Sequence, residues 1–286
     1  MDDIYATFDF GYDPATSEDC PRAILPARRE ALPARATVNP AWLPPVGRQT
    51  TPSCFVWAAI YGLATFKAAK AGGYTPSVPY LQASPFYAYV KILEQHGAAP
   101  DSCTGGRISW CLDFLQANDG TPNLEQAPFP APEPGDSSCG AAWAMYGDTS
   151  LVSDYAFNIT GGSQFGIEDE LGLDMLRRLI VEDRPLAYGT ALYADFLAYG
   201  ASPTSLESLQ VPYLGNGIIQ KMAGGRRAGH CMLVIGYDDE LGAVLLQNSF
   251  GIEWGTEWNG SRGYVWMAYD TFQALAQGSA FLITDA

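Results

Sequence analysis

The sequence lacks any apolar run of the kind that crosses a membrane, because no stretch approaches about 20 uninterrupted apolar residues. Basic residues are scarce, 16 against 31 acidic ones, and the formal net charge is −15. Such a charge repels nucleic acid and anionic membrane surfaces, so we expect neither as a partner. Residues 1–5 are acidic and no apolar segment follows them, so no secretory signal is visible. We expect a cytoplasmic protein, or one exported by a route that the sequence does not reveal.

Histidine and cysteine, which supply most zinc ligands, are also few. The only histidines are His96 and His230. The six cysteines are Cys20, Cys54, Cys103, Cys111, Cys139 and Cys231. They include no CxxC pair and match no common zinc spacing, so we expect neither a metal site nor another cofactor. Cys103, Cys111 and Cys139 lie close enough in sequence to supply one disulfide, and Cys103–Cys139 is the preferred pair.

The composition is that of a well-packed globular protein. The chain has 286 residues, 48% of them hydrophobic and 13% aromatic, which is enough for one large or two small domains. Residues 1–36 carry scattered prolines and few periodic apolar positions, which predicts an extended arm. Residues 37–135 are predicted to be mainly helical, and residues 136–286 to be rich in strands. This order predicts an α+β fold of two lobes with a cleft between them.

Four helices are predicted from apolar patterning. Residues 54–71 are apolar on almost every face, so this helix must be buried in the centre of a domain. Ser53 is its candidate N-cap, and Gly72 and Gly73 are its stop. The remaining predicted helices cover residues 85–95, 108–118 and 168–182.

The second half of the chain is predicted to form strands separated by turns rich in glycine and aspartate. The predicted strands are residues 185–193, 230–237, 243–248, 263–268 and 280–284. Five prolines between residues 122 and 134 exclude a helix there and predict a surface crossover. Residues 194–228 are predicted to form a long irregular excursion, and loops of that length are usually functional.

Three residues carry the chemistry that a cysteine hydrolase needs: a thiol, an imidazole and a carboxamide. Cys54 begins the predicted buried helix, where the helix dipole stabilises a thiolate. His230 begins an apolar strand directly after Gly229, so it can face a cleft from a rigid position. Asn248 ends the following strand and can accept a hydrogen bond from the imidazole. A cysteine is more often a buried core residue, but the position of Cys54 at a helix start favours a nucleophile. His96 is predicted to lie at a helix end, on the surface.

These residues and their surroundings resemble the papain-like cysteine peptidase family. The resemblance extends from about residue 43 to the C-terminus and rests on Gln49, Cys54, His230 and the segment Asn-Ser-Phe-Gly that begins at Asn248. Cys-Thr-Gly-Gly at residues 103–106 resembles the family's Cys-Asn-Gly-Gly, and Gly-Tyr-Val-Trp-Met at residues 263–267 resembles the ending of bacterial members. The implied fold has a helical left lobe and a β-barrel-like right lobe, with the active site between them.

The resemblance also implies a role for each residue. Gln49 would donate from its amide to the oxyanion beside the Cys54 N–H. Gly105 and Gly106 would let the substrate backbone lie close. The predicted substrate-binding residues also include Gly229 and Phe250, and the Phe250 ring would shield the Asn–His hydrogen bond.

The sequence departs from the family pattern at several points. Four residues, one fewer than in papain, separate Gln49 from Cys54, and the extra cysteine of that loop is absent. Phe250 replaces a tryptophan. Cys54 and His230 are 176 residues apart in this sequence, more than the family's usual ~130–150, and residues 194–228 can hold the surplus.

We therefore expect a cysteine endopeptidase that acts on a peptide or protein substrate. One alternative is an acyl or peptidyl transferase with the same triad, and another is a catalytically silent papain-like binding module. A further hypothesis makes residues 1–36 an inhibitory arm that occupies the cleft.

Overall fold

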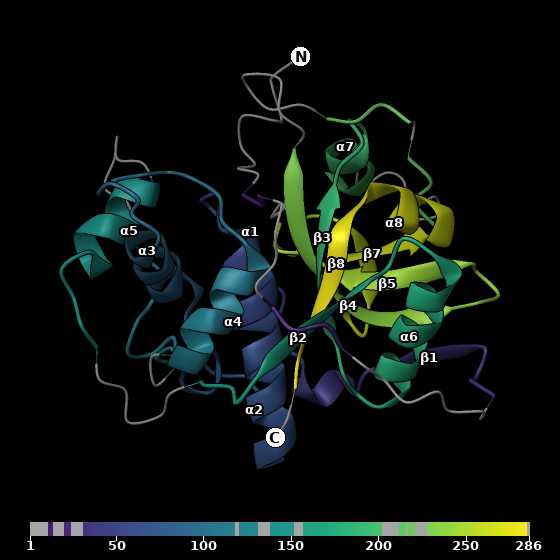
Figure 1. Ribbon diagram of the computed structural model, residues 1–286, viewed down its shortest axis with the longest axis horizontal. Helices are drawn as coiled ribbons and strands as arrows, with labels where there is room; N and C mark the ends of the chain where they lie inside the picture. Colours follow the sequence, from purple (N-terminus) through teal and green to yellow (C-terminus); the bar gives the residue numbers. More distant parts are fainter. Residues whose placement is uncertain are drawn as a thin grey trace.

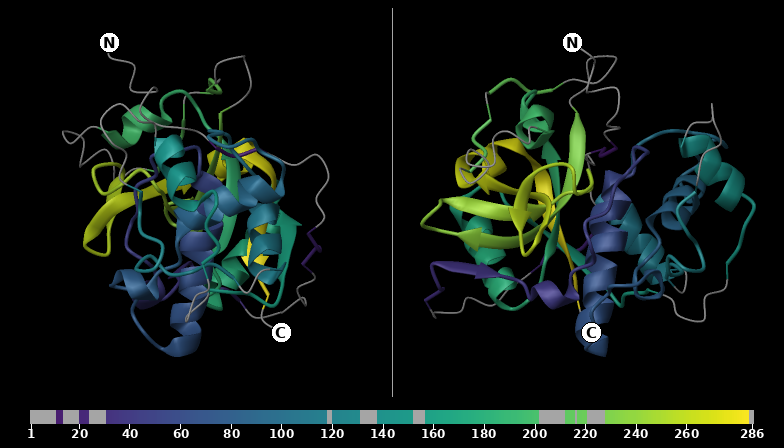
Figure 2. Two further views of the ribbon diagram at one scale, coloured as in Figure 1. Left: turned by 90° about the vertical axis from the view of Figure 1, so that its left-hand side faces the viewer. Right: turned by 180° about the vertical axis from the view of Figure 1, so that it is seen from behind.

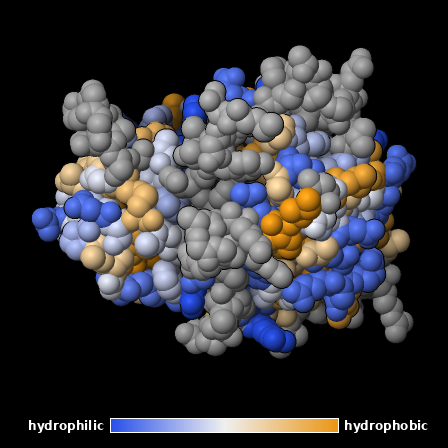
Figure 3. All heavy atoms as spheres, turned by 90° about the horizontal axis from the view of Figure 1, so that it is seen from above, coloured by the Kyte–Doolittle hydropathy of each residue, from blue (hydrophilic) through white to orange (hydrophobic). Residues whose placement is uncertain are grey.

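In the computed structural model, one side of the molecule is helical and the other is built on a single sheet that carries further helices (Figure 1). The structure describes residues 11–13, 20–23, 31–117, 120–130, 138–151, 157–201, 212–215, 217–220 and 228–284. Hydrophilic residues are spread over the face seen from above, and apolar residues form separate small groups there (Figure 3).

The predicted buried helix is present as one continuous helical rod with three parts: α1 (Cys54–Val56), the π-helical η3 (Trp57–Ala64) and α2 (Thr65–Gly72). Every residue of α1 and η3 is buried, as the all-round apolar pattern predicted. The rod ends at Gly73, which has the left-handed φ of 65° that glycine adopts without strain. The predicted N-cap is wrong in detail. Ser53 occupies the cap position, but its hydroxyl donates to the Thr51 carbonyl and caps no helical N–H.

Three further described helices complete the helical side of the molecule (Figure 1). They are α3 (Pro85–Gln95), α4 (Ile108–Ala117) and α5 (Ser138–Tyr146), and the short 3-10 helices η2 (Pro40–Trp42) and η4 (Pro79–Leu81) precede them. The helix α3 has the predicted bounds, and Ser84 caps it by accepting from the Tyr87 N–H. Although α5 lies beyond residue 135, the predicted end of the helical lobe, it packs against α3.

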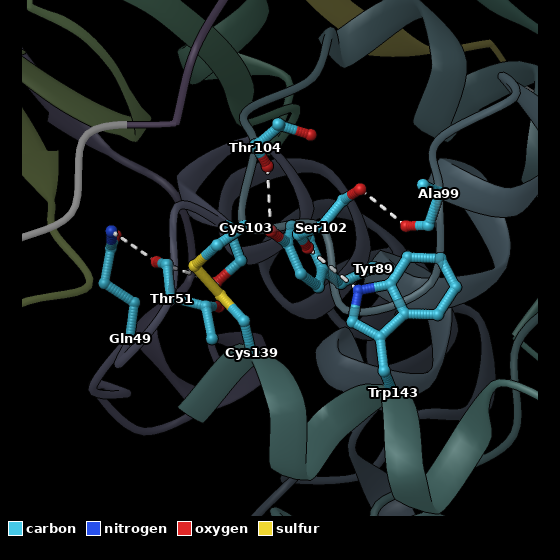
Figure 4. The surroundings of a disulfide bond; sticks show 10 residues. Gln49, Thr51, Tyr89, Ala99, Ser102, Cys103, Thr104, Cys139 and Trp143 are labelled. Carbon is cyan, nitrogen blue, oxygen red and sulfur yellow. Dashed lines mark hydrogen bonds between the residues drawn. A yellow bond between two sulfur atoms is a disulfide. The ribbon is translucent and has the colours of Figure 1, made fainter. Parts of the chain in front are cut away.

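A disulfide joins Cys103 to Cys139, which confirms the preferred pairing (Figure 4). It fastens the start of α5 to the loop before α4. Next to it, the Trp143 indole N–H donates to the Ser102 carbonyl at 2.8 Å. These bonds make α5 part of the helical side of the molecule.

In the described ranges the sheet contains eight strands, and their ladders are antiparallel. They are β1 (Arg35–Thr37), β2 (Gly162–Gly166), β3 (Leu186–Ala191), β4 (Gly229–Asp238), β5 (Ala243–Gln247), β6 (Thr256–Trp258), β7 (Ser261–Ala268) and β8 (Ala276–Ile283). Their order is β2-β8-β3-β4-β5-β7-β6, and β1 pairs with the far end of β4.

The sheet is open, so the expectation of a barrel-like lobe is wrong. Its two end strands, β2 and β6, share no ladder in the described part of the chain. Instead, Arg22 forms a parallel bridge with Gln164 of β2, and β6 is only three residues long. Closure would require the end strands to pair with each other.

Short helices cover the sheet away from the rod: α6 (Glu170–Val181), α7 (Phe196–Ala201) and α8 (Tyr269–Leu275) (Figure 1). The helix α6 was predicted. The helix α7 lies inside residues 194–228, so that excursion is not wholly irregular. Among the residues that the structure describes, no helix is long and apolar enough to cross a bilayer.

The main core lies between the helical rod and strands β3 and β4 (Figure 2). Strand β4 is buried along its whole length. Because α1 contacts β4, the first residue of the rod comes to lie beside the first residues of that strand. This packing of helix on sheet positions the site described next.

Candidate active site

Cys54 lies at the N-terminal end of the helical rod and is fully buried. Burial alone raises the pKa of the Cys54 thiol, but three neighbours act in the opposite direction. They are the side chain of Cys231, the side chain and charge of His230, and the backbone of Gly11. Together they hold the pKa of Cys54 well below its ordinary value, which favours the thiolate.

His230, the second residue of β4, is held by Asn248, which directly follows β5. The Nε2 atom of His230 and Oδ1 of Asn248 are 2.8 Å apart, and both side chains are buried. The Ser249 backbone N–H donates to the same Oδ1 at 2.7 Å, which identifies that atom as the carbonyl oxygen of the amide. Because this oxygen only accepts, Nε2 must carry the proton. The other ring nitrogen, Nδ1, then faces the chemistry at Cys54.

Phe250 covers the imidazole. Its ring stacks on His230 with centroids 4.6 Å apart and planes inclined by 26°, and Trp254 meets Phe250 edge-on at 5.5 Å. Phe250 and Trp254 are both buried, so the His230–Asn248 hydrogen bond is kept from water. The structure therefore places the Phe250 ring directly against the imidazole.

Gln49 ties the loop before Cys54 to the segment that carries Asn248. Its backbone N–H donates to the Ser249 carbonyl at 2.8 Å, and its Oε1 accepts from the Ser249 hydroxyl at 2.6 Å. Its Nε2 donates to the Thr51 carbonyl at 3.2 Å, on the loop between Gln49 and Cys54 (Figure 4). Gln49 thus holds its amide on the loop that leads to Cys54.

Residues 11–13 of the N-terminal arm lie between the two sides of the site. The Gly106 N–H donates to the Gly11 carbonyl at 2.8 Å, and the Asp13 N–H donates to the Gly106 carbonyl at 3.0 Å. From the other side, the Gly229 carbonyl accepts from the Tyr12 N–H at 3.1 Å. One tripeptide therefore binds the backbone of a residue from the helical side and of another from β4.

Two of the predicted glycines are necessary for this close approach. A Cβ atom at Gly229 would lie 2.1 Å from the Tyr12 carbonyl oxygen, and one at Gly105 would lie 2.3 Å from the Gly11 carbonyl oxygen. Any other residue would therefore clash with the bound backbone.

Sequence reasoning missed two residues of this region: Tyr12, and Gly189, which makes room for the Tyr12 ring. The Tyr12 side chain is buried, and a Cβ atom at Gly189 would lie 2.3 Å from the ring. Gly189 pairs with Cys231 across β3 and β4, and it comes from a predicted strand to which no site residue was assigned. No local pattern marks either residue, because their contact joins segments far apart in the chain.

His96 has no part in this site. It caps the C-terminal end of α3 and stacks on Trp110 with ring centroids 3.8 Å apart. Desolvation lowers the pKa of this imidazole. Within the described ranges, no three His, Cys, Asp or Glu side chains are grouped so that they could hold a metal ion.

Comparison by sequence finds no family model and no curated protein that matches the chain. Comparison of structures finds cysteine proteases over almost its whole length. Xylellain, a cysteine protease from Xylella fastidiosa, is 19% identical with a TM-score of 0.68, and the match covers 98% of this chain and 97% of xylellain.

Two proenzymes are similar as well. Procathepsin B S9 from Trypanosoma congolense is 14% identical with a TM-score of 0.67, covering 99% of this chain and 88% of its own. Digestive procathepsin L 3 from the larval midgut of Tenebrio molitor is 16% identical with a TM-score of 0.61. The match covers 93% of this chain and 75% of the procathepsin. The chain therefore has the papain-like fold.

Proposed function

We propose that this protein is a cysteine peptidase whose nucleophile is Cys54. The observation that carries the proposal is the contact of Cys54 with His230, whose far nitrogen is held by Asn248. A thiolate next to an oriented imidazole is the arrangement that nucleophilic acyl transfer requires. The papain-like fold supports the same reaction class.

The reaction follows from these positions. The Cys54 thiolate attacks the carbonyl carbon of a peptide bond, and the negative charge moves to the carbonyl oxygen. The Cys54 N–H and the Gln49 amide stabilise that oxygen. His230 gives its Nδ1 proton to the leaving amine, then takes a proton from the water that hydrolyses the acyl-enzyme. Asn248 keeps the imidazole in one tautomer and orientation throughout.

A peptide substrate would bind along Gly105, Gly106 and Gly229. The support is the way in which residues 11–13 already bind there, through backbone hydrogen bonds to Gly106 and Gly229. The pocket at Gly189 holds the Tyr12 ring, so we expect substrates with an aromatic side chain at the corresponding position to be preferred.

We further propose that the N-terminal arm inhibits the enzyme by lying in its cleft. Tyr12 fills the side-chain pocket, and Asp13 forms an ion pair with Arg107 at 3.5 Å. Gly11 offers the Cys54 sulfur a backbone hydrogen bond, while its carbonyl oxygen is bound to the Gly106 N–H. An N–H stabilises a thiolate but presents no carbon for it to attack, so the arm would be held without being cleaved.

The test compares Cys54→Ala with Cys111→Ala, both in a Tyr12→Ala background that loosens the arm. Cys111 is another buried thiol and lies outside the triad. Hydrolysis of a fluorescent protein substrate should vanish in the first variant and persist in the second. Full hydrolysis by Cys54→Ala would contradict the proposal. An added amine acceptor, with product analysis by mass, separates hydrolysis from the transferase alternative.

A further inference from the structure

The proposed mechanism leaves one thiol at the site unused. Cys231 directly follows His230 on β4, the strand on which the Cys54 end of the rod packs, and its buried thiol lies near the Cys54 sulfur. Cys54 and Cys231 are both free cysteines. Two neighbouring thiols at a nucleophilic centre are the starting arrangement for a disulfide.

We propose that Cys231 is the resolving thiol of Cys54, so that oxidation by a peroxide closes a reversible Cys54–Cys231 disulfide and switches the nucleophile off. The Cys54 thiolate attacks one peroxide oxygen, the O–O bond breaks, and with one proton the products are a sulfenic acid and water. The Cys231 sulfur then attacks the Cys54 sulfur, the S–O bond breaks, and the hydroxide takes the Cys231 proton and leaves as water. Peroxide is reduced and the two thiols are oxidised.

The pKa values of the two thiols differ in the direction that these two reaction steps require. Cys54 is the thiolate and therefore the group that reacts first with peroxide. Burial raises the pKa of Cys231, and the neighbouring Cys54 raises it further, so Cys231 keeps its proton until a sulfenic acid forms beside it. The proton that the departing hydroxide needs is thus already in place.

Cys111, the other buried thiol near the site, is arranged differently. Its Sγ is 3.7 Å from the carbonyl oxygens of Phe55 and Arg107, so its S–H is directed at the backbone of two neighbouring segments. Burial raises the pKa of the Cys111 thiol, and the charge of Cys54 raises it further. Cys111 therefore serves as the matched control: it is buried and close, but its S–H is directed at backbone carbonyls.

The positions of the two elements allow the bond to close with little movement. Cys54 begins a buried helical rod that packs on β4, the strand that carries Cys231. The Cys103–Cys139 disulfide also indicates that this chain meets oxidising conditions, in which a reversible Cys54–Cys231 disulfide can form.

The experiment exposes the full-length protein to hydrogen peroxide, blocks remaining thiols with N-ethylmaleimide, and maps the digest by mass spectrometry. The wild type should lose two of its four free thiols and yield one cross-linked peptide pair, Cys54 with Cys231, that is two hydrogens lighter. Dithiothreitol should restore both thiols. Cys231→Ala, and Cys231→Ser if the alanine variant folds poorly, should instead gain two oxygens on Cys54, which dithiothreitol does not remove. Cys111→Ala should behave as the wild type.

Three results would overturn the proposal: irreversible oxidation of Cys54 in the wild type while Cys231 stays free, a bridge from Cys54 to Cys111, or no oxidation of either thiol. The readout is a mass and does not require peptidase activity. A cross-link in a protein that hydrolyses nothing would therefore refute only the proposed function. Hydrolysis without a cross-link would refute only the switch.

Discussion

In the proposed inhibitory arrangement Tyr12 anchors the N-terminal arm in the cleft, so its replacement tests that arrangement. The side chain is only 7% exposed, and its ring fills the space beside Gly189. The change Tyr12→Ala removes the ring and keeps the backbone hydrogen bonds to Gly106 and Gly229. The arm should then leave the cleft more often, and Cys54 should become accessible.

The size of the effect follows from the burial of one aromatic side chain. Burying a large apolar side chain is worth about 1.5–3 kcal/mol, and each ~1.4 kcal/mol changes an equilibrium tenfold. The population with an open cleft should therefore rise about 10- to 100-fold. If most wild-type molecules have the arm in the cleft, every rate that requires an open cleft should rise by the same factor in Tyr12→Ala.

Two assays read this change independently. The first is the rate at which iodoacetamide alkylates Cys54, measured by mass, and it does not depend on catalysis. The second is the hydrolysis of a fluorogenic peptide. Both should increase together in Tyr12→Ala.

Control variants separate the ring from general effects. Tyr12→Phe retains the ring and should behave nearly as the wild type. Tyr80→Ala removes a tyrosine that is 45% exposed in η4 and should change neither rate. Equal alkylation rates for wild type and Tyr12→Ala would refute the view that this tyrosine holds the arm over Cys54.

Other predictions concern the site and its supports. Gln49→Ala should lower kcat about 10²- to 10³-fold in steady-state kinetics, because one oxyanion donor is lost, and an unchanged kcat would remove Gln49 from that role. Phe250→Ala should cost about 3–5 kcal/mol of folding stability, read as a lower thermal midpoint, because a buried ring is deleted. Cys139→Ser opens a loop with a sequence separation of 36 and should cost about 4 kcal/mol in denaturant unfolding. The pKa of Cys54 is lowered, so its alkylation rate should stay constant well below the pH at which a free thiol is protonated, then fall as the thiolate itself is protonated. A decline near the ordinary thiol pKa would contradict that shift.

The parts of the fold that follow from strong local patterns could be predicted. The all-round apolar run beginning at Cys54 predicted a buried helix, and Ser84 followed by proline predicted the start of α3. Chain order and element type led to Cys54, His230 and Asn248, which the structure brings together. Cys103–Cys139 was chosen on sequence distance among three candidates, and the structure confirms it.

Features that depend on distant contacts could not be predicted. In α5, apolar and polar residues do not separate onto one face, so no periodic pattern marks it. The implied barrel came from the resemblance, whereas the open sheet depends on where β2 and β6 find partners. Tyr12 and Cys231 were missed for the same reason: Tyr12 gains its role from Gly189, and Cys231 gains its role from Cys54, each far away in the chain.

The central claim is that the Cys54 sulfur is the reacting atom of a peptidase. It is tested most directly by a peptidyl epoxide, which reacts with an activated thiolate in a peptide-binding cleft, followed by mass mapping of the label on wild type and Tyr12→Ala. The account predicts one equivalent of label, on Cys54 alone, with hydrolysis lost in proportion to labelling and faster labelling of the Tyr12 variant. Label on Cys111 or Cys231, or full hydrolysis by a protein whose Cys54 is completely labelled, would contradict it.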